Sequence, residues 1–407
     1  MVNDQINSSQ NGLLDGVRVV EFGGKVSAPY CGLTLSGLGA EVIKVEPLNG
    51  DVSRKMGPFP GENADTEMSA LYLALNRGKK SVTADLSNAS DIKALKNLVG
   101  TADVIIENCP LGFLKRHGFD YHELSKLNPT LIYGSILPFG DSGPYSSYLG
   151  DDLTIFHMSS VARGMASRGE IVSDRPVRSD GYQSDLVSGM TATTAIMLMI
   201  FNRLKTGDGG HVVISSFEAM VTMVVSGLAG VIFEGGEPGP PDDDHKTSNS
   251  KSRAGAILGL LPCKDGYAAI SPREDSQWER WVLIMGSPKW AQEEKFDTKI
   301  GRNDNEEELW EHMSEWTKTR SKFDVARVCQ EKRVPCFPVN TIEDLLSDEH
   351  LSQREFFLTL KHPIAGEFDY PGFPYKVSGA VLPQNKEAAP ILGQQNDVLS
   401  DSGYLNE

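Results

Sequence analysis

Residues 16–46 read GVRVVEFGGKVSAPYCGLTLSGLGAEVIKVE, and this stretch decides the class of fold. Its first seven residues and its last seven are largely apolar runs of strand length, and the turn-forming pair Gly23-Gly24 closes the first. The residues between them have the features of a helix that ends near Gly37. A strand, a helix and a second strand in this order indicate a βαβ unit with two parallel strands.

The same alternation continues along the chain. Further strand-like runs lie at residues 81–84, 102–106, 131–136 and 211–215, with helical segments at 89–99 and 121–127. Repeated strand–helix units predict an α/β fold with a Rossmann-like parallel sheet. The loop after the first strand, GGKVSAP at 23–29, lacks the G-x-G-x-x-G pattern of dinucleotide-binding loops. We therefore expect neither NAD nor a flavin as cofactor.

The pattern of the chain changes from about residue 185 onwards. Residues 185–203 predict a long buried helix, and residues 234–253, rich in Gly, Pro, Asp and Ser, are typical of a linker. The turn KDG at 264–266 lies between two short strand-like runs and predicts a hairpin. Residues 278–331 have an amphipathic helical pattern, and short strands return after them.

Composition narrows the class of function. The 407 residues carry a formal net charge of −16, whereas nucleic-acid binding requires a basic surface, so we expect no nucleic-acid partner. The five cysteines have no metal-binding spacing, and we expect no metal site. Residues 1–12 lack the apolar stretch of a signal peptide, and the apolar run near 220–233 is too short to span a bilayer. We expect a cytoplasmic protein that does not enter a membrane.

Short motifs in order along nearly the whole chain resemble the class III CoA-transferase family, which includes formyl-CoA transferases and carnitine CoA-transferases. They include LGAEVIKVE at 38–46, NRGKKS at 76–81, ADVIIEN at 102–108, SDLVSG at 184–189 and PILG at 390–393. The resemblance implies coenzyme A, bound as an acyl-CoA substrate, and a small carboxylic acid as the second substrate. It also implies an interlocked homodimer.

The resemblance further implies a large Rossmann-like domain built from both chain ends, with a smaller α+β domain inserted from the middle. We expect residues 12–215 to form the N-terminal part of the large domain. Residues 216–330 would form the linkers and the small domain, and residues 331–407 would return to the large domain.

Asp185 has two interpretations. Local sequence favours a helix cap, because Asp commonly precedes the first turn of an apolar helix. The resemblance instead matches Asp185 to the catalytic aspartate of the family. An ionised carboxylate can attack a thioester to give an anhydride, and the released CoA thiolate can then give aspartyl-CoA. Both interpretations stay open on the sequence.

The resemblance also implies which residues bind CoA, most of them after the strands of the sheet, where ligands bind in such folds. Val26 and Ala28 would lie beside the pantetheine arm, Ala84 near the adenine, and Asn108 and Cys109 along the adenosine channel. Arg116 would bind a phosphate, for which a guanidinium is well suited. Its alternative is a solvated surface arginine.

Some positions depart from the family pattern. Ser87 and Leu137 stand where relatives carry lysines, and the four-glycine loop of oxalate-specific members is missing, so oxalate and formate are disfavoured. The G-H-D-x-N-Y motif of related racemases corresponds to GDDLTI at 150–155, with Asp151 at the histidine position. An acyl-CoA isomerase, racemase or lyase on the same scaffold, or a non-catalytic CoA-binding protein, remains an alternative to the transferase.

Overall fold

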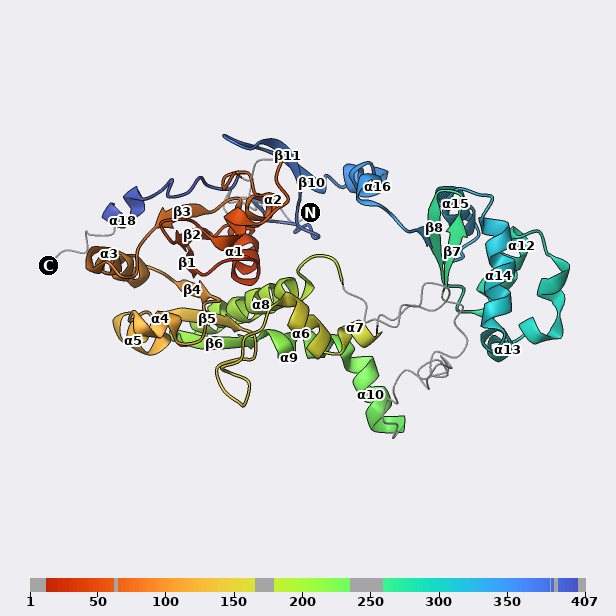
Figure 1. The fold of residues 1–407 in the computed structure, drawn as a ribbon, viewed down its shortest axis with the longest axis horizontal. Coiled ribbons are helices and arrows are strands. Elements are labelled where there is room, and N and C mark those ends of the chain that lie inside the picture. The colour runs from red at the N-terminus through yellow and green to blue at the C-terminus, as the bar shows by residue number, and fades with distance from the viewer. Residues whose placement is uncertain are drawn as a thin grey trace, which may run out of the picture. The chain divides into compact units, whose positions relative to one another are not determined.

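The computed structural model describes residues 12–61, 65–164, 179–234, 259–380, 382–383 and 387–401. The chain divides into two compact units (Figure 1). The first contains Met1–Ser167, Val172–Val225 and Gln353–Glu407, and the second contains Arg168–Ile171 and Ser226–Ser352.

A six-stranded sheet forms the centre of the first unit. Its strands are β1 (Arg18–Phe22), β2 (Glu41–Glu46), β3 (Lys80–Thr83), β4 (Val104–Glu107), β5 (Ile132–Leu137) and β6 (Gly210–Ser215). They pair in parallel in the order β3-β2-β1-β4-β5-β6. This confirms the predicted α/β fold with a parallel sheet. The chain order reverses between β1 and β4, and such a switch point is where open sheets of this kind bind ligands.

Helices cover both faces of the sheet. The helices that matter for the site and the core are α1 (Ser27–Gly37), α3 (Ala89–Gly100), α4 (Phe113–Arg116), α5 (Tyr121–Leu127) and α8 (Gln183–Thr206). Leu35 of α1 and Ile196 of α8 pack with Val19 on one face. Leu95 of α3 packs with Val20 on the other. Neighbouring strand residues enter different cores because successive side chains point to opposite faces.

The first unit also contains shorter helical segments. They are η1 (Val52–Lys55), α2 (Ala70–Asn76), α6 (Asp152–Met158), α7 (Val161–Gly164), α9 (Ser216–Val221), η2 (Thr222–Val224) and α18 (Asp397–Asp401), and α10 (Val225–Glu234) leads into the second unit.

Charged side chains on β1 and β2 are buried as ion pairs. Lys44 Nζ lies 2.9 Å from Glu21 Oε1 and 2.7 Å from Asp51 Oδ2, and all three side chains are at most 1% exposed. Lys79 Nζ lies 2.8 Å from the other oxygen of Glu21. Burial opposes the ionised form of Asp51, but Lys44 lowers the pKa of this carboxyl to about 2. Each charge is compensated only while its partner stays in place.

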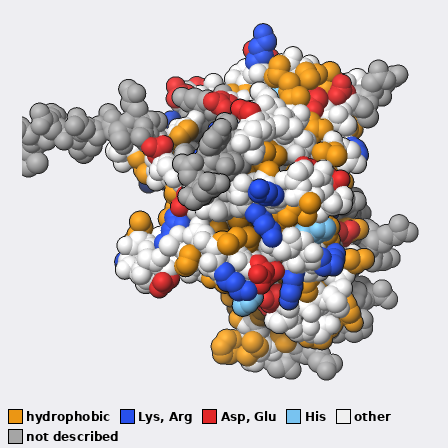
Figure 2. All heavy atoms as spheres, turned by 90° about the vertical axis from the view of Figure 1, so that its left-hand side faces the viewer, with side chains coloured by type: hydrophobic (Ala, Val, Ile, Leu, Met, Phe, Trp, Pro, Cys, Tyr) orange, Lys and Arg blue, Asp and Glu red, His pale blue; other side chains and the backbone are white. Residues whose placement is uncertain are grey.

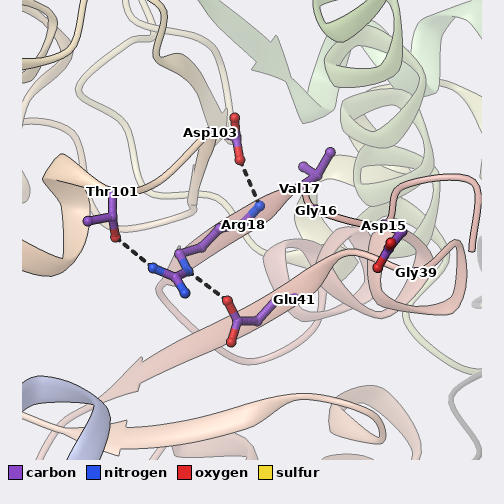
Figure 3. Close-up of a pocket in the computed structure, with 8 residues that line it drawn as sticks. All are labelled: Asp15, Gly16, Val17, Arg18, Gly39, Glu41, Thr101 and Asp103. Carbon is purple, nitrogen blue, oxygen red and sulfur yellow. Dashed lines mark hydrogen bonds and ion pairs between the residues drawn. The ribbon is translucent and has the colours of Figure 1, made fainter. Parts of the chain in front are cut away.

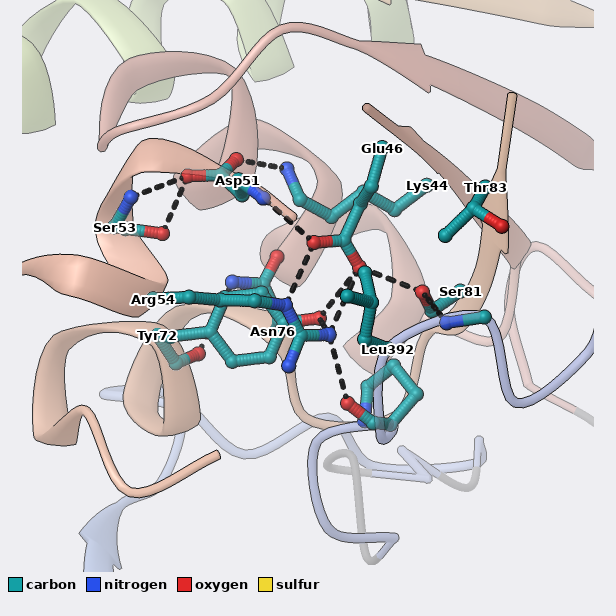
Figure 4. A network of polar contacts seen from close by, with 12 residues as sticks. Lys44, Glu46, Asp51, Ser53, Arg54, Tyr72, Asn76, Ser81, Thr83 and Leu392 are labelled. Atoms are coloured by element: carbon teal, nitrogen blue, oxygen red, sulfur yellow. Dashed lines mark hydrogen bonds and ion pairs between the residues drawn. The ribbon is translucent and has the colours of Figure 1, made fainter. Parts of the chain in front are cut away.

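A second part of this network joins β2 to the C-terminal segment. Arg54 donates from Nε to Glu46 Oε2 at 2.7 Å and from Nη2 to Glu46 Oε1 at 2.9 Å (Figure 4). It also donates to the Tyr72 hydroxyl at 2.6 Å and to the Pro390 carbonyl at 3.1 Å. One buried guanidinium therefore holds together segments more than 300 residues apart in sequence.

The C-terminal segment also covers the free edge of β3. Ser81 N donates to Gln395 Oε1 at 2.8 Å, and Gln395 N donates to the Ser81 carbonyl at 2.9 Å. Thr83 N donates to Asn396 Oδ1 at 2.7 Å. The hairpin of β10 (Phe357–His362) and β11 (Gly366–Pro371) belongs to the same unit.

The second unit has its own sheet and core. Strands β7 (Gly259–Cys263), β8 (Gly266–Ile270) and β9 (Cys336–Pro338) are antiparallel, which confirms the hairpin predicted around residues 264–266. The helical segments are α12 (Asp275–Ile284), η3 (Lys289–Gln292), η4 (Glu294–Phe296), α13 (Lys299–Asp304), α14 (Glu306–Thr317), α15 (Lys322–Glu331), α16 (Ile342–Leu346) and α17 (Glu349–Gln353). Because β9 pairs with β8, this unit continues to residue 352, beyond the boundary expected at residue 331.

Helix α8 has the length and apolar composition of a membrane-spanning helix, and so does the bent pair Ser216–Val224 and Gly227–Phe233. Core helices of soluble proteins pass the same test. In this chain one face of α8 packs against α1, β5 and β6, and 39% of its apolar window is buried.

Replacing Arg54 with leucine is expected to lower the free energy of unfolding by about 3–5 kcal/mol, because Glu46 would stay buried without its cation. The neighbouring Lys55 is exposed, so Lys55→Leu, a matched control, should change stability by no more than about 0.5 kcal/mol. Urea denaturation at pH 7 measures both. Equal losses in the two variants would contradict a structural role for the buried pair.

Candidate functional site

The loop between β1 and α1 is held at the carboxyl edge of the sheet. Asn108, directly after β4, donates to the Gly24 carbonyl at 2.8 Å and to Ser27 Oγ at 2.9 Å, and it accepts from Gly24 N at 2.9 Å. Lys44 Nζ donates to the Gly23 carbonyl at 3.0 Å. A Cβ on Gly23 would lie 2.0 Å from Asn108 Oδ1, so this close approach requires glycine.

The next residue of the loop, Lys25, points towards α8. Its backbone has a φ of 63°, in the left-handed region, and its N–H donates to Asp51 Oδ1 at 3.2 Å. Its Nζ lies 4.0 Å from Asp185 Oδ2 and 5.9 Å from the centre of the Tyr182 ring. The buried ion network therefore reaches Asp185 through the backbone of Lys25.

Asp185 lies in the first turn of α8, at the positive end of the helix dipole. Its side chain is 19% exposed, and the buried Oδ2 has no hydrogen-bond partner among the described residues. Burial raises the pKa of this carboxyl to about 6, the neighbouring Lys25 opposes the shift, and Asp152 and Asp151 add to it. The result is a carboxylate that is ionised near neutral pH yet unsolvated at one oxygen.

A different residue caps α8. The helix begins at Gln183, and the N-cap position belongs to Tyr182, whose side chain makes no capping bond. Asp152 Oδ1 instead accepts hydrogen bonds from Ser184 N at 2.7 Å and Asp185 N at 3.4 Å. The helix-cap interpretation of Asp185 is therefore wrong in this structure.

The residues expected to bind CoA lie along the carboxyl edge, but their side chains differ in accessibility. Val26, Ala28 and Ala84 are buried in the hydrophobic cores, which leaves only their backbone for contact with a ligand. Cys109 is partly buried, and burial, with nearby Glu107, raises its pKa to about 12, so it is a thiol at neutral pH. Of this set, Asn108 is hydrogen-bonded to the loop that carries Val26, and Lys25 of the same loop lies next to Asp185.

Arg116 is the exposed member of the set. Its guanidinium lies 5.8 Å from the centre of the Phe113 ring, and no described residue accepts a hydrogen bond from it. Figure 2 shows Lys and Arg side chains interspersed with Asp and Glu side chains on the side of the molecule that lies at the left in Figure 1. Exposed cations on the helices of this side are Lys93, Lys96, Lys115 and Arg116, whereas the exposed Lys126 is paired with Glu123 at 2.7 Å. Asp91, Asp120 and Glu123 lie on or beside the same helices, so this surface carries both signs of charge.

Asp151, at the histidine position of the racemase motif, has a structural role. It caps α6, accepting from Thr154 N at 2.9 Å, while its own N–H donates to Thr154 Oγ1 at 2.9 Å. His157, on the same helix, has its Nδ1 2.8 Å from the Leu153 carbonyl. Asp151 therefore serves as a helix cap, and the Nδ1 of His157 is engaged within its own helix.

A small cavity of about 280 Å³ lies at the opposite, amino edge of the sheet (Figure 3). Arg18, at its centre, donates from Nε to Glu41 at 2.6 Å and from Nη1 to Thr101 at 2.9 Å. Asp103 accepts from Arg18 N at 2.9 Å. The polar groups of this cavity satisfy one another, and it is separate from the surroundings of Asp185.

Sequence reasoning missed Lys25 and Asp152. Both stand in quoted motifs, GGKVSAP and GDDLTI, but the first was tested only as a phosphate loop and the second only for a histidine. A sequence signal was present for both residues: each is a charged side chain close to glycine. Lys25 follows the carboxyl end of a strand, and Asp152 stands at the start of a helix.

Comparison with known proteins places these residues in context. The sequence pattern of CoA-transferase family III matches residues 14–396. The chain is 31% identical over 344 residues to a succinate–glutarate CoA-transferase from Agrobacterium fabrum, covering 84% of this chain and 83% of the relative. It is 30% identical over 399 residues to a succinyl-CoA:(R)-benzylsuccinate CoA-transferase subunit from Thauera aromatica, covering 95% and 93%. A CAIB/BAIF family protein from Brucella suis has a similar structure, with a TM-score of 0.84, 30% identity and coverage of 96% and 99%.

Asp185→Asn is expected to stabilise the protein at pH 8. A carboxyl whose pKa is raised on folding destabilises the folded state. This destabilisation is complete above the folded pKa, near 6, and absent below the unfolded pKa, near 4. The gain in free energy of unfolding should therefore shrink as the pH falls from 6 to 4. Urea denaturation at pH 8, 6 and 4 measures it.

Asp152→Ala is the matched comparison, because it removes the observed cap and should cost about 1 kcal/mol at pH 8. A loss of stability in Asp185→Asn as large as that in Asp152→Ala would show that Asp185 supports the helix after all.

Proposed function

Because the chain belongs to CoA-transferase family III, we propose that it moves CoA from an acyl-CoA to a carboxylic acid through covalent intermediates on Asp185. Membership of this family makes the protein an acyl-CoA:carboxylate CoA-transferase. The observation that carries the role of Asp185 is its half-buried carboxylate, which has one oxygen without a hydrogen-bond partner and lies at the start of a long helix.

The proposed reaction exchanges one carboxylate for another without a net proton transfer. The carboxylate of Asp185 attacks the thioester carbonyl, the C–S bond breaks, and a mixed anhydride and CoA thiolate form. The thiolate then attacks the Asp185 carbonyl, which releases the first acid as its carboxylate and leaves aspartyl-CoA. The second acid attacks aspartyl-CoA, and the thiolate released attacks the acyl carbonyl of the new anhydride to give the product and free Asp185.

The environment of Asp185 suits the first step. With a pKa of about 6 the carboxyl is mainly ionised at neutral pH and is more nucleophilic than an ordinary aspartate. The missing hydrogen bond at Oδ2 leaves a lone pair available for attack. The positive end of α8 stabilises the carboxylate that must be regenerated at the end of each cycle.

CoA is proposed to lie along the carboxyl edge of the sheet. The backbone of Val26, Ala28 and Ala84 would face the pantetheine and adenine parts, and Asn108 and Cys109 would line the adenosine channel. Arg116 would bind a phosphate. The exposed guanidinium and the cations near it support this placement.

The acid substrate is proposed to be a dicarboxylate, because succinate, glutarate and benzylsuccinate, named for the two relatives, each carry two carboxylates. We also propose a cytoplasmic homodimer. Helix α8 supports the second copy, since Leu198, Phe201 and Leu204 expose 57–79% of their surface on one helix. Apolar surface of this kind is usually covered by a partner.

Asp185→Asn should abolish transfer, with a loss of at least about 10³-fold in kcat, because an amide cannot form the anhydride. CoA binding should stay within about twofold of the wild type, since the side chain acts in the chemistry. Succinyl-CoA and glutarate are suitable test substrates, with products followed by mass spectrometry.

A direct test traps the intermediate. Wild-type protein incubated with succinyl-CoA and then hydroxylamine should carry a hydroxamate on the peptide that contains Asp185, and Asp185→Asn should carry none. Near-normal transfer by the asparagine variant would refute the mechanism.

Arg116→Ala should weaken CoA binding by about 10- to 100-fold, the loss of one charge-assisted phosphate contact. Calorimetry at fixed salt measures the Kd, with Lys126→Ala, an exposed cation on α5, as control. An unchanged Kd in Arg116→Ala would return this residue to the solvated surface.

A further inference from the structure

Five charged or titratable groups lie around the first turns of α8, close to Asp185. Asp151 and Asp152 face it from the start of α6, and both disfavour its ionised form. Tyr182, the residue before α8, lies under Lys25, and Tyr30 of α1 packs against Gly189 one turn further along α8. Lys25 is the only cation within 4.0 Å of the carboxylate among the described residues.

The loop holds Lys25 in place from several sides. Gly24 is hydrogen-bonded in both directions to Asn108, Gly23 accepts from Lys44, and Lys25 N donates to Asp51. The positive φ of Lys25, unusual for a residue with a long side chain, persists because these contacts fix the backbone on both sides. A surface lysine without a role needs no such support.

We propose that Lys25 is a positioning residue for the transfer reaction: its ammonium keeps the carboxylate of Asp185 charged before each attack on a thioester. This inference rests on the proposed function, since it concerns the state of the proposed nucleophile. Burial and two neighbouring carboxylates act against the charged form, and Lys25 acts for it.

The distance between the ammonium of Lys25 and the carboxylate of Asp185 suits this role. At 4.0 Å the ammonium attracts the carboxylate but does not hold Oδ2 in a hydrogen bond that would block its attack. Removing the charge while keeping the loop should leave the nucleophile in place and change only its protonation at a given pH.

The experiment compares Lys25→Met and Lys25→Asn with Lys25→Arg. Asparagine tolerates the left-handed backbone, so it remains informative if the methionine variant folds poorly. Lys126→Met, a change in an exposed lysine of α5, is the control. The first readout is the titration of the Asp185 carboxyl by carbon-13 NMR of aspartate-labelled protein, with the resonance identified by its absence in Asp185→Asn.

The midpoint of this titration should rise by about one pH unit in Lys25→Met and Lys25→Asn and stay near the wild-type value in Lys25→Arg and Lys126→Met. The acidic limb of kcat/KM for succinyl-CoA and glutarate should move by the same amount. Activity at pH 6 would then fall about tenfold relative to that at pH 8, a change that a merely structural role would not produce.

An unmoved NMR midpoint in both Lys25→Met and Lys25→Asn would overturn the inference. A raised KM for succinyl-CoA with an unmoved acidic limb of kcat/KM would also overturn it, because Lys25 would then be a ligand-binding residue. The proposed function fails separately. If Asp185→Asn keeps its activity while the NMR midpoint moves, Lys25 controls the charge of Asp185 but Asp185 is not the nucleophile.

Discussion

The ion pairs of Lys44 with Glu21 and Asp51 are the constraint on which the site depends. These ion pairs lie where β1, β2 and the segment after β2 meet. If one residue of a pair moved away, its partner would remain as an uncompensated buried charge. Lys44 also holds the Gly23 carbonyl, and Asp51 holds the amide of Lys25. The same charges that fix the centre of the sheet therefore fix the loop that faces Asp185.

Much of the fold was predictable because the strands are apolar runs and the helices between them have ordinary lengths. The buried charges were not, since the alternation of residues in a strand gives no sign that Glu21 or Lys44 will find partners. Glu46 illustrates this: it stands at the end of an apolar run, and its carboxylate pairs with the buried Arg54. The boundary expected at residue 331 missed β9, because strand pairing with β8 depends on residues distant in sequence.

The candidate site was less predictable from the sequence than the fold. Asp185 was found through family resemblance, while local sequence favoured a capping role for it. In the structure the cap is Asp152, which accepts a hydrogen bond from the amide of Ser184, 32 residues later in the chain. The accessibility of the CoA-binding candidates depends on packing, which buries Val26 and Ala28 and leaves Arg116 exposed. Lys25 required the structure, because its position follows from a left-handed backbone and three tertiary contacts.

The covering of β3 by Gln395 and Asn396 has a consequence for biosynthesis. An uncovered edge strand is a template for pairing with other chains. The residues that cover this one are made more than 300 positions after it, so during translation the edge stays open until those residues have left the ribosome. The nascent sheet is therefore most exposed to misassembly with neighbouring nascent chains in the interval before its own C-terminal segment arrives.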